Sequence, residues 1–92
     1  MSQTDQNQDL LRKLRASVAA FAAGDMDLDG IQAALQSTMT LLENDAADAA
    51  RTVRLAEADV EEIRFTTLLA EQRPAVLRRM EELVAELPEP AA

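Results

Sequence analysis

Apolar residues recur every three or four positions along most of this chain, a spacing that places them on one face of an α-helix. The clearest run predicts a helix with Asp9 as its N-cap and Gly24 just beyond its C-terminus. Residues 1–7 and 88–92 lack this pattern, so both ends are predicted to be disordered tails. The apolar face of the first helix is formed by Leu11, Leu14, Val18 and Phe21.

A second run predicts a long helix from residue 28 to about residue 53. Asp27 or Asp29 is expected to cap its start, because a carboxylate accepts hydrogen bonds from the unpaired N–H groups there. Asn44 and Asp45 form its weakest point, since both side chains compete for backbone hydrogen bonds. Its apolar face consists of Ile31, Leu35, Met39, Leu42, Ala46, Ala49 and Val53.

Two more helical segments follow, and their apolar rows are out of phase by one residue. Pro74 lies at this slip, so a break is predicted near residues 71–73. Residues 1–92 are therefore predicted to form a single all-α domain, an antiparallel bundle of three to four helices. The two rows are Ala56, Val60, Ile63, Thr67 and Ala70, then Val76, Met80, Leu83 and Leu87.

Composition narrows the chemistry. The chain has 18 alanines but only two glycines and three prolines, which favours helices. It contains no His, Cys, Trp or Tyr, so most catalytic nucleophiles, general bases and soft metal ligands are missing. We therefore expect a non-enzymatic protein that uses no cofactor.

The chain carries 17 acidic and 9 basic residues, a formal net charge of −8. This charge argues against nucleic acid and against an anionic membrane as partners, because both attract Lys and Arg. No apolar run approaches the roughly 18 residues of a membrane span, and the start lacks the features of a signal peptide, so a cytoplasmic protein is expected. A basic protein partner is the natural complement, with solubility alone as the alternative explanation of the charge.

The segment from Asp25 to Gly30 spells the start of a calcium-binding EF-hand loop, with acidic residues at alternate positions and glycine at the sixth. The twelfth position of such a loop requires a bidentate Glu, but it is Gln36 here. The same residues suit a glycine-terminated helix followed by an Asp-capped one. We expect the second arrangement and no metal site.

Acidic residues are dense between positions 43 and 62. A turn near Arg54 would gather them at one end of the bundle, where they would steer a basic partner. The alternative is an ordinary solvated helix face. The predicted partner-binding residues are Asp45, Asp48, Asp59, Glu61, Glu62 and Phe65.

Phe65, Leu68 and Leu69 widen the apolar face of the third segment beyond what one neighbouring helix can bury. They are either covered by the fourth helix or exposed for a partner or a homodimer. Coverage by the fourth helix is the favoured interpretation.

An acidic, all-helical chain of 92 residues, with no signal peptide and no catalytic residues, resembles the small immunity proteins of bacterial toxin systems, such as those of the colicin type. The segment from Phe21 to Gly24, followed by an acidic turn, is also similar to helical members. The resemblance implies a protein that binds a basic toxin domain, often a nuclease, and covers its active site with carboxylates. A homo-oligomeric structural or adaptor protein is the alternative.

Overall fold

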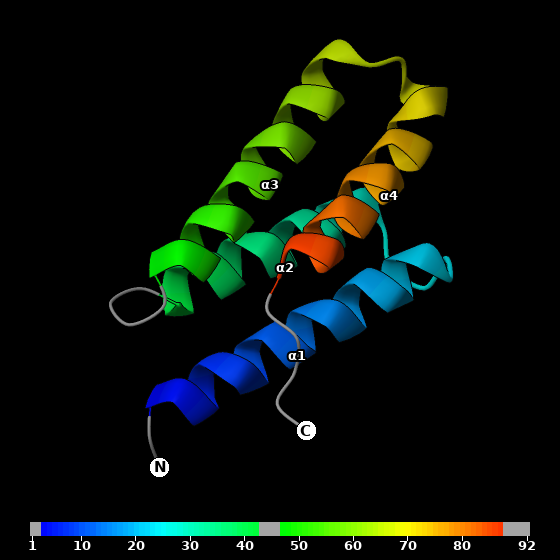
Figure 1. Cartoon of the computed structure of the whole chain (residues 1–92). Helices are drawn as coiled ribbons and strands as arrows, with labels where there is room; N and C mark the ends of the chain where they lie inside the picture. The colour runs from blue at the N-terminus through cyan, green and yellow to red at the C-terminus, as the bar shows by residue number, and fades with distance from the viewer. Residues whose placement is uncertain (1–2, 43–46, 88–92) are drawn as a thin grey trace.

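The computed structural model describes residues 3–42 and 47–87, and within them the chain forms four helices and no strand. α2 packs on α3, α3 packs on α4, and α1 packs on both α2 and α4. In Figure 1, α3 and α4 form a hairpin whose turn projects at the top of the view. This confirms the predicted all-α bundle. The helices are α1 (Gln3–Ala22), α2 (Leu28–Leu41), α3 (Ala47–Thr66) and α4 (Leu69–Glu86).

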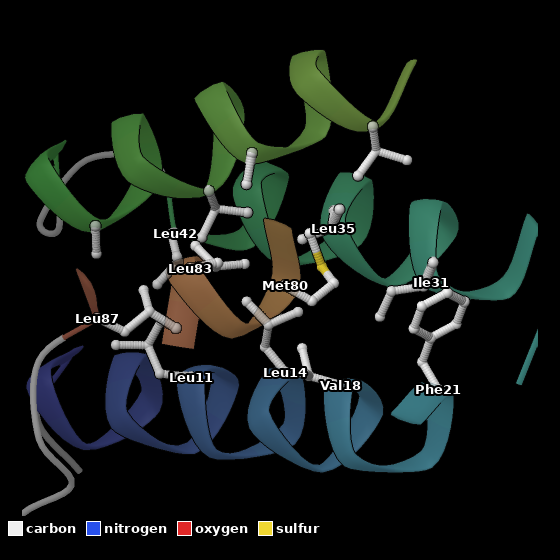
Figure 2. Packing of buried hydrophobic residues seen from close by; sticks show 14 of the residues in the cluster. Leu11, Leu14, Val18, Phe21, Ile31, Leu35, Leu42, Met80, Leu83 and Leu87 are labelled. Atoms are coloured by element: carbon white, nitrogen blue, oxygen red, sulfur yellow. The ribbon is translucent and has the colours of Figure 1, made fainter. Parts of the chain in front are cut away.

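The core consists of one row of apolar side chains from each helix, including the residues that directly follow α2 and α4 (Figure 2). Both the first and the last row are buried as their spacing predicted. α3 contributes mainly small side chains, which lets its neighbours approach closely. None of the helices in the described part of the chain is long and apolar enough to cross a bilayer. The rows are Leu11, Leu14, Val18 and Phe21; Ile31, Leu35 and Leu42; Ala49, Ala50, Val53, Ala56 and Val60; and Val76, Met80, Leu83 and Leu87.

The turn between α1 and α2 uses Gly24 and Asp27 in the predicted way. Gly24 has a φ of 87°, a left-handed conformation that costs glycine little. The N–H groups of Gly24 and Asp25 donate to carbonyl oxygens in the last turn of α1, at 3.1 and 2.9 Å, and close it in a Schellman motif. Asp27 then caps α2, because its side chain accepts from the N–H of Gly30 at 2.7 Å.

α1 begins earlier than its apolar pattern indicated. The helix starts at Gln3, so the predicted N-cap at Asp9 is wrong, as is the predicted disordered tail over residues 3–7. Asp9 lies inside the helix and pairs with Arg12 at 3.4 Å and Lys13 at 3.2 Å. Such pairs support a polar first part of a helix, which hydrophobic periodicity does not reveal. The other predicted tail residues lie outside the described ranges.

The single helix predicted over residues 28–53 is in fact two helices, α2 and α3. The interruption escaped prediction because the apolar positions continue in phase across it. Leu42 and Ala49 are seven residues apart, about two helical turns, and both are buried. The predicted weak point at Asn44 and Asp45 lies outside the described residues.

The break predicted near residues 71–73 lies earlier, where α3 ends and Thr67 follows. Gln72 contacts the chain at this end of α3. Its side-chain amide donates to the backbone carbonyls of Arg64 at 3.2 Å and Thr67 at 3.0 Å, which satisfies groups left unpaired at the end of α3. Pro74 lies inside α4, in the second turn, where its missing N–H removes one intrahelical hydrogen bond.

Candidate functional site

Three large apolar side chains are exposed where α3 turns into α4. Phe65 is 83% exposed, Leu68 74% and Leu69 81%. The prediction that the fourth helix covers them is wrong, because α4 starts directly after the turn and runs back along α3 (Figure 1). Its first residues therefore project from the end of the hairpin. These three residues are termed the apolar tip.

Leu68 occupies the N-cap position of α4, where a side-chain oxygen usually accepts from an unpaired backbone N–H. Leucine has no such acceptor, and α4 has no side-chain cap bond. Because most of the side chain is exposed, packing does not explain it either. Departures from local folding rules of this kind are expected at functional sites.

Three exposed carboxylates lie within about one helical turn of the apolar tip along the chain. Glu61 and Glu62 precede Phe65 by about one helical turn on α3, and Glu71 lies in the first turn of α4. None of the three forms an ion pair within the described part of the chain. We name Glu61, Glu62 and Glu71 the acidic rim.

Arginines close to the apolar tip in sequence are engaged elsewhere. Arg64 pairs with Asp29 of α2 at 2.7 Å and donates to the side-chain oxygen of Gln32 at 2.8 Å. Arg73 donates to the backbone carbonyl of Phe21, and its guanidinium lies 4.2 Å from the centroid of that ring. Both cations bind groups of the first two helices, so neither forms an ion pair with the acidic rim.

The remaining predicted partner-binding residues are not gathered around the apolar tip. Asp48 is exposed in the first turn of α3, roughly 20 Å along the helix axis from Glu62 at about 1.5 Å per residue. Arg54 lies inside α3, so the turn predicted near it is wrong, and with it the gathering of acids at that end. Asp45 lies outside the described residues.

Asp59 is held by Arg79 of α4, whose Nε lies 2.7 Å from the carboxylate. Arg79 also pairs with Glu86 at 3.1 Å, and only 14% of its side chain is exposed. Burial lowers the pKa of Arg79, but the hydrogen bonds and charges of Asp59 and Glu86 together raise it above its ordinary value. Asp59 therefore serves the contact between α3 and α4, whereas Glu61, Glu62 and Phe65 face solvent together.

A shallow groove of about 350 Å³ runs between α3 and α4 beside the acidic rim. Glu62 and Thr66 line its α3 side, while Arg78 and Glu82 line its α4 side. The groove shares Glu62 with the rim, so the two surfaces adjoin. Within the described ranges, no cluster of three or more acidic side chains is arranged to hold a metal ion.

Sequence reasoning singled out Glu61, Glu62 and Phe65 as partner-binding residues, but it did not include Glu71 or recognise that Leu68 is the N-cap of α4. The sequence contains a signal that could have identified both Glu71 and the N-cap position of Leu68. Glu71 is the third residue of a helix, where a capping-box glutamate is typical, yet the residue three positions earlier is leucine instead of Ser or Thr.

Comparison with known proteins finds no matching family, no matching curated protein and no matching solved structure.

Proposed function

We propose that this chain is a non-enzymatic protein-binding module that recognises a basic partner through the end of the α3–α4 hairpin. The observation that carries the proposal is an exposed apolar tip next to carboxylates that form no ion pair among the described residues. The carboxylates speed association with a positively charged surface, and the apolar side chains supply contact area.

Within this class, we propose an inhibitor similar to the immunity proteins. The hairpin end covers basic residues that the partner needs for its own substrate, and the net charge of −8 attracts the partner from a distance. The inhibition is occlusion, which requires no catalytic group on this chain.

The test begins with capture of the partner from the source organism on immobilised protein. Association is then measured for Glu62→Lys and for Glu81→Lys. Glu81 is a matched control, because it is also an exposed glutamate but lies on α4 about 15 Å along the helix from Glu71. We expect Glu62→Lys to slow association by about three- to tenfold at low salt and Glu81→Lys to change it less.

Inhibition of the captured protein should weaken in the same order. Equal association rates for the two variants would count against the proposal. So would an association rate that does not change with ionic strength.

The exposure of the apolar tip also favours a second candidate function, a homo-oligomeric structural or adaptor module. Sedimentation separates the two candidates. A stable dimer that dissociates on Leu68→Asp favours the adaptor, and a monomer favours the inhibitor.

A further inference from the structure

We infer that the apolar tip receives an amphipathic segment of another protein, with apolar side chains flanked by lysine or arginine, and not a second copy of this chain. The inference rests on the proposed function. It adds the kind of surface that the partner presents and names Phe65, Leu68 and Leu69 as its anchor.

The charge around the apolar tip favours a different protein over a second copy of this chain as the binding partner. A symmetric contact through the apolar tips brings two acidic rims together, because a twofold interface places the same patch of each copy face to face. Arg64 and Arg73 are held by groups on α2 and α1, and the exposed Arg78, which lines the groove with Glu62, is one cation against the three carboxylates of each rim. A partner with Lys or Arg beside its apolar residues replaces this repulsion with ion pairs.

The available area leads to the same choice. Three side chains at these exposures offer on the order of 400 Å², so a symmetric pair of tips would bury roughly 800 Å². Stable specific interfaces bury about 1,200 to 2,000 Å². The tip alone is thus too small for a stable dimer, whereas a longer segment gains area by continuing into the groove beside Glu62.

A substitution at Leu68 can remove a partner contact without destabilising the fold. Serine at this position suits an N-cap and matches Glu71 three residues later, so Leu68→Ser removes an apolar anchor while preserving α4. Leu55→Ser is the matched control. Leu55 is also exposed, at 55%, but lies about 15 Å along α3 from Phe65.

The probe is a fluorescently labelled synthetic peptide that forms an amphipathic helix of leucine and lysine. One comparison peptide has glutamate in place of every lysine, and a second has serine in place of every leucine. Binding is followed by fluorescence anisotropy, and the site is located from amide chemical shifts of the full chain. We expect the leucine–lysine peptide to bind, to shift the resonances from Glu61 to Glu71, and to bind Leu68→Ser at least fivefold more weakly than Leu55→Ser.

Weaker binding of both comparison peptides would support the inference, because the contact then needs apolar and basic side chains together. Wild-type affinity in Leu68→Ser, equal binding of the glutamate peptide, or shifts elsewhere on the bundle would overturn it. A dimer of the free chain that Leu68→Ser dissociates would also overturn it. If Leu68→Ser leaves binding of the captured partner intact while Glu62→Lys slows it, only this inference fails and the proposed function stands.

Discussion

The guanidinium of Arg73 lies 4.2 Å from the centre of the Phe21 ring and donates a hydrogen bond to the Phe21 carbonyl. One side chain of α4 thus covers the last aromatic residue of α1 and also satisfies a carbonyl at the end of that helix. Phe21 is 1% exposed, and the Arg73 guanidinium is one of the groups that cover it. The contact joins α4 to the C-terminal end of α1 beside the Gly24 turn.

Arg73→Met is expected to lower the free energy of unfolding by about 1 to 2 kcal/mol, because it loses a cation–π contact and a charged hydrogen-bond donor but keeps an aliphatic stem. Urea unfolding measures this loss. Arg78→Met is the control, since Arg78 is exposed on the same helix and should change stability by less than about 0.5 kcal/mol. Similar losses in both variants would show that the contact with Phe21 adds nothing specific.

Gln72 is 9% exposed and donates to two carbonyls at the end of α3, so Gln72→Ala is expected to destabilise the fold by about 1 to 2 kcal/mol. Gln72→Glu should cost more at neutral pH, because an ionised carboxylate cannot donate to those carbonyls. Protonation restores a donor, so folding raises the pKa of the introduced carboxyl. Its deficit relative to Gln72→Ala should therefore shrink as the pH falls from neutral towards about 4.3, the ordinary pKa of a glutamate, and should not change further below that pH. A constant difference across that range would contradict this account.

Hydrophobic spacing predicts which helix faces are buried, because apolar residues three or four positions apart lie on the same face of a helix. Val18 and Phe21 of the first row, and Val76 and Met80 of the last, are all in the core as expected. Spacing does not predict where helices end, since that depends on contacts between distant residues. The amide of Gln72 donates to carbonyls at the end of α3, a contact that no sequence pattern reveals.

The candidate site could be predicted only in part for the same reason. Glu61, Glu62 and Phe65 are neighbours in sequence, so their proximity on α3 follows from helical geometry. The engagement of Asp59 by Arg79, which lies twenty residues further along the chain, depends on the packing of two helices. Local sequence pattern therefore could not separate Asp59, which pairs within the fold, from the carboxylates that form no ion pair among the described residues.

The turn from Asp25 to Gly30 is expected to bind no calcium. Asp27 already accepts from the N–H of Gly30 at 2.7 Å, and Asp29 pairs with Arg64 at the same distance, so a cation would have to displace both contacts. Calorimetric titration with calcium should give no binding heat at about millimolar concentration, the range of weak extracellular sites. A saturable heat that disappears in Asp27→Asn would contradict this prediction.

Leu68→Ser is expected to raise the free energy of unfolding by about 0.5 to 1 kcal/mol, although it replaces a large apolar residue by a small polar one. The serine oxygen can accept from the N–H of Glu71, and the Glu71 carboxylate can reach back to the N–H at position 68. We place the gain at the low end of the usual range, because the Glu71 N–H already donates to the Leu68 carbonyl at 2.8 Å.

Urea unfolding of Leu68→Ser and Leu68→Ala together tests the reason for this gain. Leu68→Ala provides no acceptor and should stay within about 0.5 kcal/mol of the wild type, since the leucine is 74% exposed. If both variants are destabilised, Leu68 contributes to the fold and the case for a contact residue weakens. If Leu68→Ser is more stable than the wild type yet binds the leucine–lysine peptide more weakly, leucine at position 68 strengthens binding and lowers the stability of α4.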